Sequence, residues 1–247
     1  MAMRPINITA RIDEALTLNE LATQREREAN PSGIDRMSSA GRCVRDRWAS
    51  ARGLPVDRGK GFAHNPKLLR VFRLGHILED EVVALLEEGG YNVHSQQLEV
   101  GSVESGWLGH IDGMIDFETP FGIPRTALLE IKTCNTRRFA ELTEIDSYAE
   151  WSPGYAAQLQ AYMMHLPVEE ALVVVYNKDT SELYHETVLF DIDEARAIEK
   201  SAALVTAEGT LPPKKPRAAT SQYCKFCKWC DRSEWCWVSA ADVEFDE

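Results

Sequence analysis

Alternating apolar and polar positions predict strands in the middle of the chain. Residues 107–117 alternate apolar with small or polar positions, as a half-buried strand does. Residues 118–124 contain the Pro and Gly of a turn, and residues 125–132 return as an apolar run. The pattern predicts a β-hairpin at the centre of the chain.

The other elements follow from the same periodicities. We expect helices over 11–29, from Ser38-Ser39 to about 51, and over 66–88, 137–147, 152–166 and 192–208, with strands over 91–100, 170–178 and 183–190. The helix over 66–88 has the strongest pattern, with an apolar face of Leu69, Phe72, Ile77, Val83 and Leu86. The order of these elements, with helices and strands mixed along the chain, predicts an α/β core with a mixed central sheet flanked by helices. A proline-rich linker at 211–216 suggests three parts: an N-terminal helical arm (1–37), a core (38–211) and a C-terminal cysteine segment (212–247).

Three charged residues of the hairpin come together in the predicted pairing. Glu130 and Lys132 stand two apart in a strand, so their side chains project from the same face, and the paired strand places Asp112 beside them. Two carboxylates and a main-chain carbonyl, that of Ile131, can hold Mg²⁺ or Mn²⁺, hard cations that prefer oxygen ligands. A neighbouring Lys can stabilise developing negative charge or orient the attacking water, which is the chemistry of phosphodiester hydrolysis. An exposed Glu–Lys pair on an edge strand is the alternative explanation.

Charge is distributed unevenly along the chain. The 247 residues carry a formal net charge of −12, yet residues 36–73 contain ten Lys and Arg against two acidic residues, and residues 212–232 contain six against one. Because phosphate binding depends on local potential, both segments are candidates for DNA contacts. There is no run of about 18 apolar residues and no charged-then-apolar N-terminal signal. We therefore expect a soluble, intracellular, cytoplasmic protein of bacterial or phage type with no membrane partner.

Four of the six cysteines crowd into residues 224–236 with the spacing C-x₂-C-x₂-C-x₅-C. Clustered thiols at this spacing indicate metal ligation rather than a disulfide framework. A local site of Cys224, Cys227, Cys230 and Cys236 would hold zinc or a cluster. Cys134, directly after the hairpin, is expected to be a small buried residue.

Four short motifs occur in an order that resembles the RecB-like PD-(D/E)xK nucleases and their phage relatives. They are Gly75-x-x-x-Glu79, Gly109-x-x-Asp112, Glu130-Ile131-Lys132 and Gln158-x-x-x-Tyr162. The resemblance implies a restriction-endonuclease-like core in which Asp112, Glu130 and either Glu79 or His76 bind the metal, with Glu79 favoured. It also implies that Gln158 and Tyr162, neighbours on one helical face, hydrogen-bond a phosphate or a catalytic carboxylate. Tyr162 could also stack on a base.

The cysteines extend the resemblance to the iron–sulfur nucleases of this class, which include the CRISPR-associated and AddB-type exonucleases. In these, one Cys before the core joins C-x₂-C-x₅-C after it to close a 4Fe–4S cluster. The matching residues here are Cys43, Cys227, Cys230 and Cys236, with Cys224 as surplus or alternative ligand and zinc as the alternative metal. Such a cluster would form a lobe that joins the two ends of the chain, and the Cys43 helix would contribute to it. It would also bring together five cations that we expect to contact phosphates: Arg42, Arg45, Arg47, Lys225 and Lys228.

The resemblance implies a metal-dependent DNA exonuclease acting on single-stranded DNA or DNA ends in recombination, repair or spacer acquisition. A recombination or CRISPR-adaptation protein is a possible partner. The alternative is a non-catalytic module that binds DNA or a partner through an iron–sulfur or zinc site, with Asp112 and Glu130 purely structural. A third interpretation is a zinc protein in which the Glu-x-Lys motif arose by chance.

Overall fold

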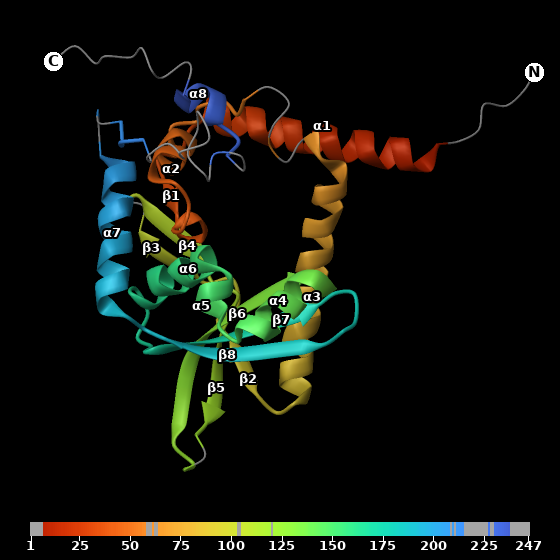
Figure 1. Cartoon of the computed structure of the whole chain (residues 1–247), viewed down its shortest axis with the longest axis vertical. Coiled ribbons are helices and arrows are strands. Elements are labelled where there is room, and N and C mark those ends of the chain that lie inside the picture. The colour runs from red at the N-terminus through yellow and green to blue at the C-terminus, as the bar shows by residue number, and fades with distance from the viewer. Residues whose placement is uncertain are drawn as a thin grey trace, which may run out of the picture.

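The computed structural model of this chain describes residues 7–57, 61, 64–102, 105–119, 121–207, 209, 211–214, 227 and 230–237. Two β-sheets lie at its centre, and helices pack against both faces of the larger one (Figure 1). The expected α/β core with a mixed sheet flanked by helices is confirmed. Within the described ranges, no helix has the length and apolar character needed to cross a membrane.

The larger sheet contains the predicted hairpin. Its five strands, in spatial order, are β2 (Asn92–His94), β5 (Gly113–Glu118), β6 (Pro124–Cys134), β7 (Glu170–Asn177) and β8 (Leu183–Leu189). Strands β6 and β7 are parallel, and every other neighbouring pair is antiparallel, so the sheet is mixed. In the β5–β6 hairpin, Gly113 pairs with Leu129. β6 is the central strand, and Leu128, Leu129 and Glu130 on it are fully buried.

A smaller sheet corrects two strand predictions. It consists of β1 (Asp35–Arg36), β4 (Trp107–His110) and β3 (Glu99–Ser102), in the order β1-β4-β3. The predicted strand 91–100 is therefore two strands, β2 and β3, and the predicted strand 107–117 is also two, β4 and β5. In the second case the chain leaves one sheet for the other at Ile111–Asp112, where the Ile111 N–H donates to the carbonyl of Leu98. Asp112 thus lies at the junction between the sheets and not within a strand.

Helices pack against both faces of the larger sheet. On one face, Val82 and Val83 of α3 (Pro66–Glu88) pack with Leu129 and Ile131. The other face carries α4 (Thr136–Ile145), α5 (Tyr148–Trp151) and α6 (Pro153–Met163), whereas α7 (Ile192–Thr206) packs against α6 and against α2 (Val44–Ala51) (Figure 1). The small apolar residues of α6 allow it to lie close to β6, and the helix is buried from Ala156 to Met163.

The predicted apolar face of α3 is only half right. Val83 is buried and Leu86 packs with it, but Ile77 is 65% exposed and Phe72 is 41% exposed. The N-terminal half of α3 extends past the sheet toward α1 (Ile8–Ala29), so no sheet surface is available to it (Figure 1). An ion pair between Arg70 and Asp13 joins the two helices there.

The helix that contains the Arg series starts later than predicted. Residues 37–39 form a short 3-10 turn, and α2 (Val44–Ala51) begins after Cys43, whose extended backbone makes it the N-cap. Ser38 and Ser39 therefore do not cap α2. Gly41 explains the intervening turn, because a Cβ at this position would lie 2.3 Å from the Cα of Gly154. The short helices α5 and α8 (Ser233–Trp237) were not predicted.

The described C-terminal residues lie against α2 and the loop that follows it (Figure 1). Asp57 accepts hydrogen bonds from the backbone N–H groups of Glu234 (2.7 Å) and Trp235 (3.1 Å) at the start of α8. Arg232 donates to the Leu54 carbonyl and to Asp46. Two segments from opposite ends of the chain are thus held together by polar contacts.

Candidate active site

The hairpin brings together the three charged residues that the sequence singled out. Lys132 Nζ lies 2.5 Å from Glu130 Oε1 and 3.9 Å from Asp112 Oδ2. Asp112 Oδ2 also accepts the backbone N–H of Ile131 at 2.8 Å. This hydrogen bond crosses from the sheet junction to β6, so it fixes the Asp112 carboxylate beside the Glu-x-Lys pair. The predicted juxtaposition is present.

Glu130 occupies an unusual environment for a carboxylate. Its side chain is fully buried on the central strand. Glu130 Oε1 lies 2.5 Å from Lys132 Nζ and accepts a hydrogen bond from the side-chain amide of Gln158, on α6, at 2.8 Å. Oε2 is buried and has no hydrogen-bond partner among the described residues. One oxygen of Glu130 is therefore held in place, while the other is left with unused capacity to accept.

The charges of this group act strongly on one another. The pKa of Glu130 is raised to about 7, mainly because the side chain is buried. The negative charges of Asp112 and Glu79 raise this pKa further, and the positive charge of Lys132 lowers it. Burial by itself would lower the pKa of Lys132, but the carboxylates of Glu130 and Asp112 raise that pKa above its usual range. Lys132 is thus held as an ammonium ion that compensates two carboxylates.

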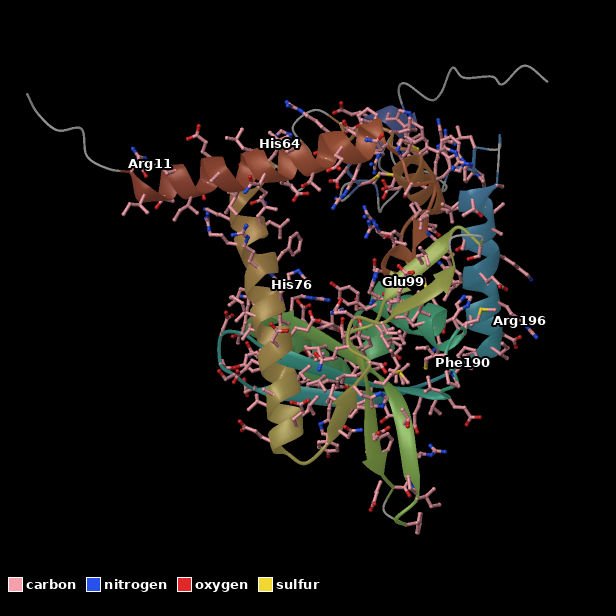
Figure 2. All side chains as sticks on the ribbon, turned by 180° about the vertical axis from the view of Figure 1, so that it is seen from behind. Arg11, His64, His76, Glu99, Phe190 and Arg196 are labelled. Carbon is pink, nitrogen blue, oxygen red and sulfur yellow. The ribbon has the colours of Figure 1, made fainter. Side chains whose placement is uncertain are left out.

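Glu79 joins this group, whereas His76 lies at its rim. The pKa of Glu79 is raised, first by burial and then by the negative charge of Asp112, so the two carboxylates are within electrostatic range. The Glu79 side chain is 22% exposed, and its Oε1 accepts from Gln97 at 3.1 Å. His76 lies on α3 (Figure 2). Its side chain is 82% exposed, and its Nδ1 lies 3.7 Å from Glu79 Oε2. Of the two metal-ligand candidates, Glu79 has the better position.

Gln158 bonds to a residue of the site itself, whereas Tyr162 bonds to the backbone that precedes Asp112. Gln158 contacts Glu130 directly. Tyr162 is 1% exposed, and its hydroxyl donates to the carbonyl of His110 at 2.8 Å. The ring also packs on Gly109, where a Cβ would lie 2.4 Å from the tyrosine Cε1. Tyr162 therefore fixes the strand just before Asp112, and the expectation that it stacks on a base is wrong because its ring is buried.

Two of the three predicted phosphate-binding arginines are structural. Arg47 is 3% exposed and forms a buried ion pair with Asp35, and it also donates to the Ala40 carbonyl and to Ser201. Arg45 is 6% exposed and donates to the carbonyl of Pro212. Neither can reach a phosphate, because each is enclosed by its own partners. Arg42 has a half-exposed side chain that pairs with Asp46 at 2.8 Å. Lys225 and Lys228 lie outside the described residues.

The sequence interpretation missed a pair of tyrosines beside the site. Tyr148 and Tyr155 stack with ring centroids 6.5 Å apart, and the Tyr155 ring lies 5.3 Å from Lys132 Nζ. The hydroxyl of Tyr148 is buried without a hydrogen-bond partner in the described chain, and its pKa is raised by burial and then by Glu130. The only sequence signal was the place of Tyr155, three residues before Gln158 on a helix.

Three of the proposed cluster ligands lie near one another. The pKa of the Cys230 thiol is raised to about 12, first by burial and then by the negative charge of Asp46. Cys43 and Cys227 also raise it, so both of these thiols are within electrostatic range of Cys230. The indole Nε1 of Trp237 donates to Cys227 Sγ at 3.2 Å. Cys236 is in α8, and Cys224 lies outside the described residues. Cys134 is buried, as expected.

Neither the hairpin nor the cysteines form a ready-made metal site. Among the described side chains, no group of three or more His, Cys, Asp and Glu is arranged so that it could hold a metal ion. In the hairpin, the ammonium of Lys132 lies against the oxygen atoms that a cation would need.

Comparisons with known proteins give only distant likenesses. No protein-family model matches the sequence, and no curated protein matches it significantly. Among solved structures, the alkaline exonuclease LHK-Exo from Laribacter hongkongensis aligns with 74% of this chain and 91% of its own, at 17% identity and a TM-score of 0.49. The structure called SSO0001 aligns with 92% of this chain and 94% of its own, at 17% identity and a TM-score of 0.48. Such values assign neither a family nor an activity, so function has to be inferred from the site itself.

Proposed function

We propose that this protein is a metal-dependent deoxyribonuclease that hydrolyses phosphodiester bonds in single-stranded DNA or at DNA ends. The observation that carries the proposal is the buried, unpartnered Oε2 of Glu130, next to Asp112, Glu79 and Lys132. Burying a carboxylate oxygen without a hydrogen bond is costly, and such an arrangement is retained where the oxygen serves a ligand.

The types of donor present match a hard divalent cation, but in the described structure they are not arranged around one point, and the Lys132 ammonium lies against two of them. Glu79, Asp112 and Glu130 supply carboxylate oxygens, and the Ile131 carbonyl supplies a fourth, a donor set typical of Mg²⁺ or Mn²⁺. When bound, such an ion would polarise a phosphoryl oxygen and lower the pKa of a coordinated water. Binding requires Lys132 to yield part of its contact with Glu130 Oε1, which a flexible four-carbon side chain can do.

The chain's own residues have separable tasks in this proposal. Lys132 orients the attacking water or stabilises the charge that develops on the phosphate. Gln158 keeps Glu130 in one orientation by donating to Oε1, which leaves Oε2 free of a hydrogen bond within the described residues. Tyr162 fixes the carbonyl of His110, two residues before Asp112, and so positions the junction between the sheets. A positioned base and a preorganised charge each contribute about a hundredfold or more to such reactions.

We further propose that Cys43, Cys227, Cys230 and Cys236 bind a 4Fe–4S cluster, with zinc as the alternative. The proximity of Cys43 and Cys227 to Cys230, and the docking of residues 231–237 on the α2 region, support it. Metal binding would then stabilise the contact between the two ends of the chain. Anaerobic purification followed by iron, sulfide and zinc analysis tests this: brown protein with iron and sulfide supports the cluster, and colourless protein with stoichiometric zinc refutes it.

The test of the nuclease proposal is cleavage of end-labelled oligonucleotides with Mg²⁺, Mn²⁺ or EDTA. We expect cleavage that depends on the divalent ion and falls at least about a hundredfold in Asp112→Ala and in Lys132→Ala. Asp116→Ala is the matched control, because Asp116 lies on the same hairpin but its side chain contacts Asn92, Thr126 and the half-buried His94 and not the Glu130 group. Full activity in Asp112→Ala or Lys132→Ala would overturn the assignment. DNA binding without any cleavage would favour the binding-module alternative.

A further inference from the structure

Tyr155 presents an exposed aromatic surface at the edge of the candidate active site. It is the third residue of α6, the helix that packs beside β6, and lies one turn before Gln158 (Figure 1). Its ring centroid is 5.3 Å from Lys132 Nζ. Tyr155 is 41% exposed, whereas Tyr162 on the same helix is 1% exposed. Solvent, or a substrate, can therefore reach the ring beside Lys132.

The surrounding structure holds this ring in a fixed orientation. Tyr148 stacks on it at an interplanar angle of 18°. Tyr148 is itself fully buried, and its backbone N–H donates to Glu186 on β8 at 2.6 Å. Ser152 accepts the backbone N–H of Tyr155 at 2.9 Å in the first turn of α6. An aromatic side chain packed on a buried neighbour loses little entropy when it binds a ligand.

We propose that Tyr155 is the stacking surface for an unpaired nucleobase next to the scissile phosphate. The inference rests on the proposed nuclease function, since the phosphate has to lie within reach of Lys132. A ring this close to the Lys132 ammonium is placed beside the sugar and base attached to that phosphate. Stacking on an aromatic side chain tolerates any sequence because every base has a π-face.

The substrate class follows from the geometry of stacking. In a duplex, each base is covered on both faces by its neighbours and is paired at its edge, so only an unpaired or unstacked base offers a face to Tyr155. The site would therefore take a single strand or a frayed end. The competing role on the same contacts is that the ring acts only by covering Lys132. The two roles differ in whether the effect of Tyr155 depends on the presence of a base.

The experiment uses pairs of single-stranded oligonucleotides that are identical except for an abasic site at each position flanking the cleaved bond. In Mn²⁺, we expect the wild type to lose about tenfold in kcat/KM at the abasic position that faces Tyr155. Tyr155→Ala should cleave the intact strand about as slowly as the wild type cleaves the abasic one, with no further loss on the abasic strand. Tyr155→Phe and Tyr155→Trp should keep the preference for a base. Tyr91→Ala is the matched control, because Tyr91 has 45% exposure at the far end of α3.

Two outcomes would overturn the stacking proposal. One is Tyr155→Ala retaining the full preference for the base, and the other is an equal loss on both strands, which would assign Tyr155 to covering Lys132. Anisotropy of the same labelled strands in EDTA separates this test from the nuclease assignment. If the wild type does not cleave, the nuclease proposal fails, but a base-dependent affinity that disappears in Tyr155→Ala would still support stacking. Equal affinity for both strands would refute it.

Discussion

The hairpin around Glu130 and the α2 region around Arg47 both bury charged side chains, but they use them differently. The side chains of Arg47 and Asp35 are each 1% exposed, and Arg47 donates to Asp35, the Ala40 carbonyl and Ser201. Glu130 is just as deeply buried, yet its Oε2 has no hydrogen-bond partner in the described residues. A buried charge whose polar atoms are all satisfied indicates a structural role, whereas an unpartnered carboxylate oxygen that lies near further carboxylates is a candidate ligand position. The contrast separates residues that hold the fold from residues that we propose act on DNA.

The largest expected effect concerns Glu130. Glu130→Gln keeps the shape of the side chain but removes its charge, so metal-dependent cleavage should fall about a hundredfold or more. Glutamine can still accept from Lys132 and Gln158 through its Oε1, so the free energy of unfolding should fall less than in Arg47→Ala, where nothing replaces the lost partner. Paired cleavage assays and urea denaturation measure both quantities. A stable variant with wild-type activity would remove Glu130 from the site.

The opposite result is expected for Arg47. Arg47→Ala leaves Asp35 buried without its partner, which should lower the free energy of unfolding by about 3–5 kcal/mol. Arg42→Ala is the control, since the Arg42 side chain is half-exposed and the buried Asp46 keeps Arg232 as a partner, so the change should cost about 1 kcal/mol or less. Urea denaturation of the three proteins provides the comparison. A cost for Arg47→Ala as small as that of Arg42→Ala would contradict the structural role.

The pH dependence of stability should also distinguish Glu130. Its pKa is raised from 4.5 to about 7, so in EDTA the folded state keeps a proton that the unfolded state has lost over this range. The contribution of Glu130 to stability is therefore greatest below pH 4.5 and is lost as pH rises through about 7, by about 3 kcal/mol in all. The difference between the unfolding free energies of the wild type and Glu130→Gln, measured in EDTA from pH 4.5 to 8, isolates this effect. A difference that does not change with pH would contradict the raised pKa.

A smaller effect is expected at the contact between the two ends of the chain. Asp57 caps α8 through two backbone N–H groups, so Asp57→Ala should lower the unfolding free energy by about 1–2 kcal/mol. Asp57→Asn should recover part of the loss, because an amide oxygen also accepts. Thermal or urea denaturation measures both variants. Equal stability in Asp57→Ala and wild type would show that the C-terminal segment is not held by this cap.

The sequence predicted the hairpin of the candidate site better than the ends of the chain, and the reason is the range of the interactions. Glu130 and Lys132 share a face because of strand periodicity, which is local, and the hairpin register brings Asp112 near them. The break at Ile111–Asp112 was missed because the alternation of apolar positions continues across the change of sheet. Gln158 was predicted as a carboxylate or phosphate contact, and its contact with Glu130 agrees with the first of these.

Arg45 and Arg47 were misassigned to DNA because exposure depends on partners far along the chain. Arg47 bonds to Ser201 on α7, and Arg45 bonds to Pro212. A local count of positive charges cannot distinguish a solvent-facing arginine from one enclosed by such contacts. The apolar face of α3 was predicted correctly for its C-terminal half but not for its N-terminal half, because periodicity does not reveal where the sheet ends. The same limit hid Tyr155, whose importance comes from its position beside Lys132.

The central claim is that the open oxygen of Glu130, with Asp112, receives a divalent cation. Calorimetric titration of Mn²⁺ into the wild type, Glu130→Gln and Asp116→Asn tests it most directly, because Mn²⁺ prefers oxygen to thiolate ligands and so reports on the hairpin rather than the cysteines. We expect saturable binding in the wild type and in Asp116→Asn, and an affinity at least about tenfold weaker in Glu130→Gln. Absence of binding in the wild type, or equal affinity in all three proteins, would contradict the claim.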